Sequence, residues 1–406
     1  MLNVTEIRKD FPFFTNQPLA YLDNSATSQK PKCVLDAEYQ FYVDSNANPF
    51  RGIYDLSTRA TDAYENARHA VAELLHAPDD SQIVFTRNAS ESLNLLAYSF
   101  GDLVLQPGDE ILVSTAEHHS NMLPWRAAAE RHGATVKYLD MDASGLITPE
   151  MVKANLTEHT RIFAVAQVSN IFGRENPIRD FAAVCHANGT YLVCDGAQSV
   201  PHMAVDVQDL DVDFLVFSGH KMLAPMGIGA LYGRKELLEQ MPPFLTGGEM
   251  IQSVSKERIT LAQLPHKFEA GTVNAAGAVG LAEAIRYLNE IGFDAIQERE
   301  NALTKQLIEG ARKVPYVHIL GAEDPEDHHG IMTFQIDGVH PHDVAAIFAD
   351  QQVAVRAGHH CAQPLHILLG VPSTTRASLM FYNTEEEVDR FLAVLSQIRG
   401  AMGYAD

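Results

Sequence analysis

Two short apolar runs each end in polar residues that could do chemistry together. Residues 213–217 lead into Ser218-Gly219-His220-Lys221, and residues 191–194 lead into Asp195-Gly196-Ala197-Gln198. If both runs are strands of one parallel sheet, a lysine and an aspartate reach the same edge of it. This pair suits pyridoxal 5'-phosphate (PLP), because the lysine can form a Schiff base and the aspartate keeps the pyridine nitrogen protonated. Neither tetrapeptide is specific alone, since a lysine after a strand is usually solvated and Asp-Gly is usually a turn.

A phosphate-binding segment is predicted further upstream. Thr86-Arg87-Asn88-Ala89-Ser90-Glu91 lies where a predicted strand, 82–86, passes into a predicted helix, 88–100. A helix N-terminus offers free amides and a favourable dipole to an anion, and Ser90 adds a hydroxyl. The same residues also suit an ordinary helix cap with Glu91 in the first turn, and the two functions are compatible. Ser218 and His220 could reach the same phosphate.

Paired histidines follow another predicted strand, 110–114. The imidazole of His118 could stack on the pyridine ring and relay protons. His118-His119 could also indicate a metal, but no third ligand stands at useful spacing, so we predict no metal site. Gln198 is placed to hydrogen-bond the phenolic oxygen of the cofactor, although a solvated turn would look the same.

A candidate nucleophile lies in Arg356-Ala357-Gly358-His359-His360-Cys361-Ala362-Gln363-Pro364. A thiol beside two imidazoles and an arginine would favour the nucleophilic thiolate. A single cysteine is more often a small buried hydrophobe, and His-His-Cys could be part of a zinc site. Gly358 and Pro364 indicate a constrained loop instead, so we predict that Cys361 is a nucleophile. Cys194 lies inside a predicted strand and is expected in the core.

Arg376 is a candidate for binding a substrate carboxylate. It opens a predicted strand, 376–382, within Thr374-Thr375-Arg376-Ala377-Ser378. A guanidinium binds a carboxylate through two parallel hydrogen bonds, which would fix the orientation of an amino acid. An isolated arginine is a surface residue by default, so this prediction depends on the other motifs.

The pattern between residues 81 and 232 predicts a mostly parallel, seven-stranded sheet. Helical segments separate most of the strands, so helices should cover both faces and ligands should bind at the carboxyl ends. There is no Gly-x-Gly-x-x-Gly after the first strand and no Walker lysine motif, which excludes the usual dinucleotide and P-loop sites. The predicted strands are 82–86, 110–114, 135–139, 161–168, 191–194, 213–217 and 227–232, and the helices between them include 88–100, 124–132 and 178–188.

After Gly271 the pattern changes to that of a smaller α+β domain. Helices are predicted at 275–291, 294–314, 342–351 and 385–399, and strands at 330–336 and 376–382. We therefore predict a large α/β domain over residues 20–286. The small domain would combine residues 1–19 with residues 287–406.

Composition excludes some classes of partner. The net charge of −22, from 30 basic and 52 acidic residues, argues against nucleic acid, whose binding needs basic residues. The four cysteines are scattered without a Cys-x-x-Cys pair, which suits a reducing compartment. The N-terminus lacks the pattern of a signal peptide, and no apolar stretch approaches the roughly 20 residues of a membrane span. We predict a cytoplasmic protein without membrane or nucleic-acid partners.

These motifs together resemble a PLP-dependent cysteine desulfurase of the SufS class (group II, NifS-like) within the class V aminotransferases, which implies the fold-type I architecture. The resemblance covers nearly the whole chain. The segments that carry it are Tyr21 to Ala26, Arg51-Gly52, Glu117 to Asn121, Val168-Ser169-Asn170, Asp195 to Gln198, Ser218 to Lys221, Phe268 to Thr272, Arg356 to Cys361 and Arg376.

The resemblance implies a role for each candidate residue. Lys221, Cys361 and His118 would be catalytic, with Lys221 bound to the cofactor, His118 stacked on its ring and Cys361 accepting sulfur. The remaining cofactor ligands would be Asp195, Gln198, Ser90, Ser218, His220, Asn170 and Thr272, with Thr272 supplied by the other subunit of a homodimer. The substrate would be bound by Arg376, Asn170 and Arg356.

The implied reaction converts L-cysteine to L-alanine and leaves a persulfide on Cys361, which would supply sulfur for iron–sulfur cluster assembly. The compact loop followed by Ala362-Gln363-Pro364 resembles enzymes that use a SufU-type acceptor protein, with a SufE-type partner also open. The alternatives are a selenocysteine lyase on the same scaffold, or a catalytically silent scaffold protein for iron–sulfur assembly. Joint retention of Lys221, Asp195, His118 and Cys361 argues against the silent scaffold.

Overall fold

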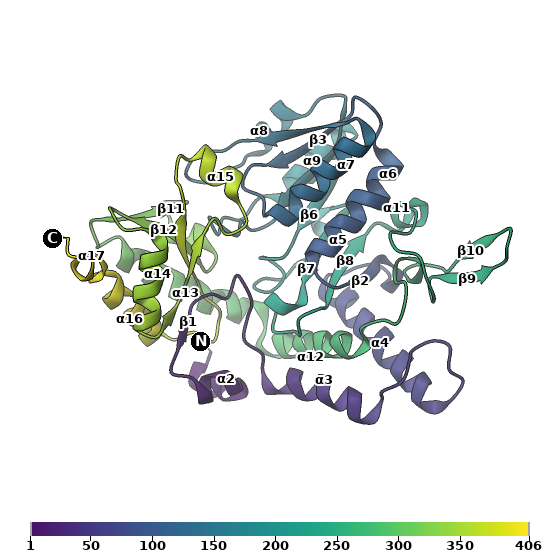
Figure 1. Ribbon diagram of the computed structural model, residues 1–406, viewed down its shortest axis with the longest axis horizontal. Helices are drawn as coiled ribbons and strands as arrows, with labels where there is room; N and C mark the ends of the chain where they lie inside the picture. The colour runs from purple at the N-terminus through teal and green to yellow at the C-terminus, as the bar shows by residue number, and fades with distance from the viewer. Residues whose placement is uncertain (1, 405–406) are drawn as a thin grey trace.

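A seven-stranded sheet forms the centre of the molecule in the computed structural model, which describes residues 2–404 (Figure 1). Its strand order is β2-β8-β7-β6-β5-β3-β4. Strand β8 is antiparallel to both of its neighbours, β2 and β7, and the remaining pairs are parallel. The predicted fold class is confirmed. The bounds are β2 Ile83–Thr86, β3 Glu110–Ser114, β4 Thr135–Leu139, β5 Thr160–Ala166, β6 Tyr191–Asp195, β7 Phe214–Ser218 and β8 Gly229–Gly233.

Both faces of this sheet are buried. Alternate residues of each strand point to opposite faces, so one strand contributes side chains to two hydrophobic clusters. Phe163 and Val165 of β5 enter one hydrophobic cluster, whereas Ile162 and Ala164 enter a second. Cys194 lies in the first cluster, as predicted. Helices α4 (Asp55–Leu74), α9 (Ile178–Asn188) and α12 (Ala275–Ile291) contribute to the first cluster, and α5 (Ala89–Leu95), α7 (Leu123–His132) and α11 (Lys235–Gln240) to the second. Helix α3 (Lys32–Asp44) packs along α12.

A second, four-stranded antiparallel sheet has the order β11-β12-β15-β14. Its core includes residues of three helices, α13, α14 and α16. Strand β1 near the N-terminus pairs with β13, so the first residues join this part of the chain. The bounds are β1 Ala20–Tyr21, α13 Phe293–Ala311, β11 Val317–Leu320, β12 Ile331–Ile336, α14 Pro341–Asp350, β13 Val353–Ala354, β14 Arg356–Gly358, β15 Thr374–Ser378 and α16 Glu385–Leu395. The predicted boundary at residue 286 falls within α12, and the division into domains stays a prediction.

The predicted strand 376–382 is wrong at both ends. Strand β15 starts at Thr374 and ends at Ser378, so Arg376 is central rather than first. The chain then turns, because Asn383 donates its backbone N–H to Met380 O (2.8 Å) and accepts the Met380 N–H at Oδ1 (2.9 Å). These bonds close a tight turn, which an apolar run in the sequence does not reveal.

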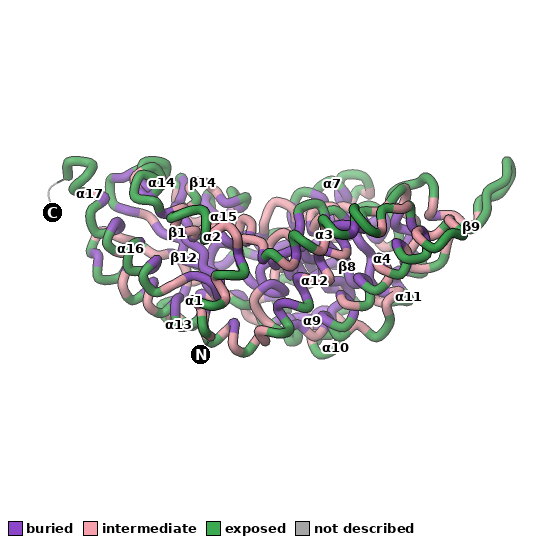
Figure 2. Tube along the Cα trace, turned by 90° about the horizontal axis from the view of Figure 1, so that it is seen from below, coloured by how far each residue is buried: buried purple, intermediate pink, exposed green. Residues whose placement is uncertain are grey.

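Two further features differ from the sequence-based expectations. The helix expected over 88–100 is α5 followed by a π-helical stretch, Leu96–Phe100, and by α6 (Gly101–Val104). The hairpin of β9 (Ile251–Val254) and β10 (Ile259–Leu261) was not predicted, and it projects as an exposed arm (Figures 1 and 2). From residue 2 to residue 404, no helix is both long and apolar enough to cross a membrane.

Candidate active site

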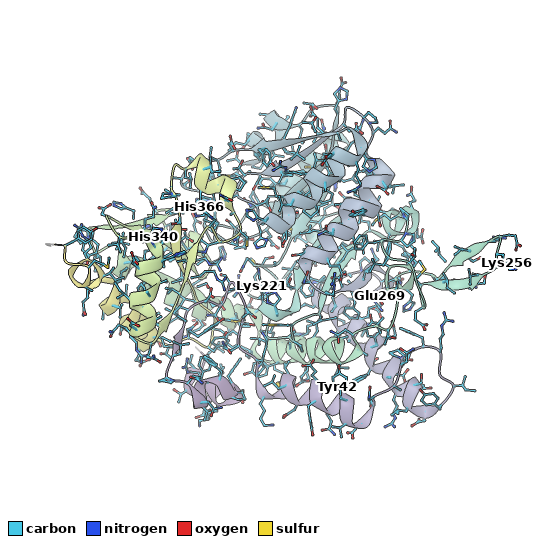
Figure 3. All side chains as sticks on the ribbon, viewed as in Figure 1. Tyr42, Lys221, Lys256, Glu269, His340 and His366 are labelled. Atoms are coloured by element: carbon cyan, nitrogen blue, oxygen red, sulfur yellow. The ribbon has the colours of Figure 1, made fainter. Side chains whose placement is uncertain are left out.

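The site lies at the carboxyl edge of the large sheet, between the two sheets (Figure 3). Strands β2, β3, β5, β6 and β7 run in one direction, so the residues that follow them meet at this edge. They line a cavity of about 290 Å³ with residues of the smaller sheet and its loop. Every predicted site residue except Thr272 lines it: Ser90, His118, Asn170, Asp195, Gln198, Ser218, His220, Lys221, Arg356, Cys361 and Arg376.

Lys221 and Asp195 share a buried environment. Burial lowers the pKa of Lys221 to about 8, although the negative charge of Asp195 opposes the shift. Burial also raises the pKa of Asp195, while Lys221 and the N–H of Ala197, which lies 2.9 Å from Asp195 Oδ1, counter that effect. A buried carboxylate is stable when it has a positive partner, and a protonated ring nitrogen would supply one. A lysine of lowered pKa is a good nucleophile toward a carbonyl.

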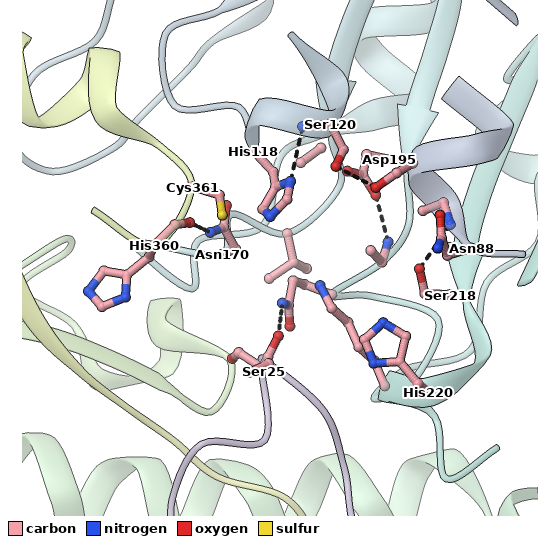
Figure 4. Close-up of a pocket in the computed structure, with 18 of the residues that line it drawn as sticks. Ser25, Asn88, His118, Ser120, Asn170, Asp195, Ser218, His220, His360 and Cys361 are labelled. Carbon is pink, nitrogen blue, oxygen red and sulfur yellow. Dashed lines mark hydrogen bonds between the residues drawn. The ribbon is translucent and has the colours of Figure 1, made fainter. Parts of the chain in front are cut away.

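His118 is held as a neutral imidazole. Its Nδ1 accepts the backbone N–H of Ser120 at 3.1 Å (Figure 4), which leaves the other ring nitrogen, Nε2, to carry the proton. Burial and the positive charge of Lys221 lower the pKa of His118 to about 3. The ring is therefore uncharged at neutral pH and suited to stacking on an aromatic ring.

One end of the cavity lies at the N-terminus of α5, where free amides and hydroxyls suit an anion. Asn88 caps this helix by accepting the N–H of Glu91 at 3.0 Å, and Ser218 Oγ accepts the N–H of Ala89 at 2.9 Å. A Cβ on Gly229 would lie 2.8 Å from Asn88 Cα, so only glycine allows β8 to approach the helix this closely. Ser90 and Ser120 share a 2.6 Å hydroxyl contact. Sequence reasoning singled out neither Asn88 nor Ser120, although both lie within segments that it had named.

Gln198, which also lines the cavity, is held in place by the backbone of another segment. Its Nε2 donates to the backbone oxygen of Ser25 at 3.0 Å, so one of its two N–H groups is oriented by the chain near the N-terminus (Figure 4). The side chain is buried rather than solvated, which excludes the alternative of an exposed turn. The second N–H can serve a ligand oxygen.

Two arginines lie side by side on neighbouring strands of the smaller sheet. Arg356 of β14 and Arg376 of β15 are register partners, an arrangement that is unfavourable unless a negative charge compensates it. Asp23 supplies that charge: it binds Arg356 Nη2 at 2.8 Å and lies 3.7 Å from Arg376 Nη2. Sequence reasoning missed this role of Asp23. Its segment, Tyr21 to Ala26, was part of the resemblance, but only the fold brings it to β15.

Arg376 is buried and has spare binding capacity. Its Nη1 donates to Asn170 O at 2.9 Å, whereas its buried Nε has no hydrogen-bond partner among residues 2–404. Burial lowers the pKa of Arg376 to about 10, so the guanidinium is still charged at neutral pH. A charged, buried and partly unpaired guanidinium in a cavity is a natural binding group for a carboxylate.

Cys361 lies on the loop between β14 and helix α15 (Gln363–Leu368); the residue is exposed and lines the cavity. The interpretation that both neighbouring imidazoles support a thiolate is wrong for His360. Its Nε2 contacts Thr374 Oγ1 at 3.0 Å, and its ring points away from the thiol (Figure 4). Burial and Arg376 lower the pKa of His360 to about 2, so it carries no charge. Adjacent residues in this loop face different sides of it.

Thr272 lies outside this cavity. It is exposed and lines a separate surface pocket with Arg87 and Asn274. The loop that carries it is anchored by Glu269, whose carboxylate is buried and binds Arg68 at 2.7 and 2.8 Å. The contribution of Thr272 to a second subunit stays a prediction. Within residues 2–404, no three His, Cys, Asp or Glu side chains gather in a way that could hold a metal ion.

The donor set fits PLP in each of its parts. Lys221 can attach to the carbonyl carbon, Asp195 can face the ring nitrogen, His118 the ring and Gln198 the phenolic oxygen. The hydroxyls and amides at the start of α5 suit the phosphate. The class V aminotransferase model matches residues 20–391, and the chain belongs to that family, with PLP as its cofactor.

Several relatives are similar to this protein over nearly its whole length. A probable cysteine desulfurase of Staphylococcus epidermidis is 46% identical over 407 residues, covering 99% of this chain and 98% of its own. The structure resembles the cysteine desulfurase CsdA (S-sulfonic acid) from Escherichia coli, with a TM-score of 0.92, 38% identity and 99% of each chain covered. A cysteine desulfurase from Thermococcus onnurineus NA1 gives a TM-score of 0.94 at 39% identity, covering 98% of this chain and 99% of that one.

Proposed function

We propose that the protein is a cysteine desulfurase that converts L-cysteine to L-alanine and receives the sulfur on Cys361. One observation carries the proposal: the thiol of Cys361 and the amine of Lys221 line the same cavity, although they come from different sheets of the fold. A PLP enzyme without sulfur chemistry would have no use for a thiol in that place. The relatives described above support the same activity.

The binding groups orient the substrate. Arg376 holds its carboxylate, assisted by Asn170 and bounded by Arg356. PLP supplies a protonated ring that accepts electrons when bonds to the substrate carbons break. Asp195 would keep the ring nitrogen protonated and His118 would cover the ring, while Ser90, Ser218 and His220 would hold the phosphate.

Two residues of the chain then carry out the chemical steps, one transferring protons and the other accepting sulfur. The amine of Lys221 takes the proton from the substrate Cα and delivers a proton back to the product. Cys361 Sγ, as thiolate, attacks the substrate sulfur: a sulfur–sulfur bond forms and the Cβ–S bond breaks, with its electron pair moving onto carbon. Protonation of Cβ gives alanine. The sum is cysteine plus protein thiol giving alanine plus protein persulfide, and no outside oxidant is needed.

The product balance tests this proposal. Holoenzyme incubated with L-cysteine without reductant should release alanine, and peptide mass spectrometry should find one added sulfur atom on Cys361. With excess reductant, alanine and sulfide should appear in equal amounts. Pyruvate and ammonia in place of alanine would indicate an elimination reaction and would overturn the proposal.

Replacing Arg376 by lysine is expected to raise KM for L-cysteine about ten- to a hundredfold, the effect of losing one charged hydrogen bond. Arg179→Lys is the matched control, because that side chain is 70% exposed, paired with Asp209 at 2.9 Å and outside the cavity. Its KM should change less than about threefold. Steady-state kinetics on variants with unchanged cofactor absorbance would check both. Equal effects would show that Arg376 has no special part in binding the carboxylate.

The proposal also includes two protein partners, a second copy of this chain and a sulfur-acceptor protein. We propose a homodimer in which Thr272 completes the phosphate site of the second copy, which would explain why an exposed threonine sits on a firmly anchored loop. The sulfur would pass to an acceptor protein, of the SufU type in preference to the SufE type, and on to iron–sulfur assembly. The predicted cytoplasmic location is consistent with four free cysteines in the described chain.

A further inference from the structure

The loop that carries Cys361 has an unfavourable backbone. His360 and Cys361 are consecutive non-glycine residues with positive φ, 49° and 57°. Side chains other than glycine rarely adopt this conformation, and it persists only where the surroundings hold it. One internal bond, from Ala362 N–H to His359 O at 2.8 Å, closes the loop but does not attach it to the rest of the molecule. Other contacts must therefore fix it over the cavity.

On the side of the smaller sheet, His359 Nε2 contacts Pro372 O at 2.8 Å and His360 Nε2 contacts Thr374 Oγ1 at 3.0 Å. The contacts on the other side come from two loops of the large sheet. Asn170 Nδ2 donates to His360 O at 2.9 Å, and the backbone N–H of His119 donates to Cys361 O at 2.6 Å. The imidazole of His119 makes a further bond, because its Nε2 accepts the backbone N–H of Gln363 at 3.2 Å. His119 thus contacts the thiol-bearing residue itself and Gln363, two residues further along the chain, whereas its neighbour His118 faces the cavity.

The imidazole bond requires a neutral His119. A backbone N–H can only donate, so Nε2 must keep its lone pair and the proton must sit on Nδ1. Burial and the nearby His359 lower the pKa of His119, which favours this uncharged state at neutral pH. The two bonds from His119 therefore act together on residues 361 and 363.

We propose that His119 is a positioning residue that clamps the Cys361 loop to the large sheet and keeps the thiol over the substrate sulfur. The inference rests on the proposed function for its catalytic consequence, but the clamp itself is a property of the loop.

Two substitutions of His119 by amide side chains test whether the hydrogen bond from the imidazole matters, as distinct from the size and polarity of the side chain. In His119→Gln the amide oxygen stands about where Nε2 stands, so it can accept the Gln363 N–H. In His119→Asn the amide is one carbon shorter and cannot reach. Both variants keep the backbone N–H of residue 119. His318→Asn is the control, since His318 lies on β11, exposed and paired with Asp337 at 2.9 Å.

Hydrogen–deuterium exchange of the holoenzyme would be measured for the peptide covering residues 359–365, together with kcat and KM for L-cysteine. His119→Asn should speed exchange about three- to tenfold, the factor that loss of one hydrogen bond gives, and lower kcat with little change in KM. His119→Gln and His318→Asn should match the wild type.

Equal exchange in all four proteins would overturn the clamp. Equal damage in His119→Gln and His119→Asn would also overturn it, because the acceptor position would then be irrelevant. These results are independent of the proposed function, since exchange is read without turnover. If Cys361 were not the sulfur acceptor, Cys361→Ala would keep full activity while the exchange difference in His119→Asn remained.

Discussion

Replacing Cys361 by alanine is expected to abolish sulfur release, with alanine formation from L-cysteine falling by at least about a thousandfold. The reason is that covalent catalysis has no substitute once the attacking atom is removed. The residue is exposed and on a surface loop, so the substitution should not disturb the core. Cofactor absorbance should therefore be unchanged. Alanine and sulfide, measured together in the presence of reductant, give the result.

Cys33→Ala is the matched control for this experiment. Cys33 is the remaining cysteine that is not fully buried, and it does not line the cavity. Its removal should leave turnover within about twofold of the wild type, as expected for a side chain away from the reacting atoms. A Cys361→Ala enzyme as active as the wild type would show that sulfur leaves without a protein persulfide. In that case an elimination reaction would replace desulfuration.

Lys221→Ala should also reduce turnover by at least about a thousandfold, but for another reason. The variant loses the group that attaches the cofactor and moves the Cα proton. Cofactor should still bind, through the residues around Ser90 and Asp195, but borohydride reduction should no longer fix it to the protein. Intact-mass analysis after reduction, with the exposed Lys256→Ala as control, distinguishes the two cases. A Lys221→Ala protein that still retains cofactor covalently would contradict the assignment.

The lowered pKa of Lys221 adds a pH dependence to cofactor loading. Only the neutral amine attacks a carbonyl, and an ordinary lysine with pKa near about 10.4 is almost wholly protonated at neutral pH. Because burial lowers the pKa of Lys221 to about 8, its neutral fraction grows as pH rises toward 8 and levels off above it. The rate at which apoprotein takes up PLP, followed by absorbance, should follow the same curve. A rate still rising steeply near pH 10 would show an unperturbed lysine.

Much of the fold could be read from local patterns. The run 110–114 matched β3 to the residue, because four of its five residues are buried in a sheet covered on both faces, where strands are mostly apolar. The run 135–139 also matched, although β4 is an edge strand that contains Lys137 and exposes Thr135 and Tyr138. Polar residues that follow parallel strands lie at one edge of the sheet. The sequence therefore predicted that Ser90, His118, Asp195 and Lys221 lie close together. Short irregular pieces, such as the β9–β10 hairpin and the π-helical stretch, have no comparable pattern and were missed.

The sequence by itself therefore determined the sheet, the edge at which chemistry occurs, and the residue types that suit PLP and a nucleophilic thiol. Tertiary structure decided how the second sheet meets that edge. The register of β14 against β15 sets Arg356 opposite Arg376, and Asp23 reaches both from the start of the chain. The same packing turns His360 away from the thiol that it adjoins in sequence and brings His119 to the backbone of the loop that carries the thiol. Such contacts join residues far apart in the chain, and neither spacing nor periodicity encodes which of them will meet.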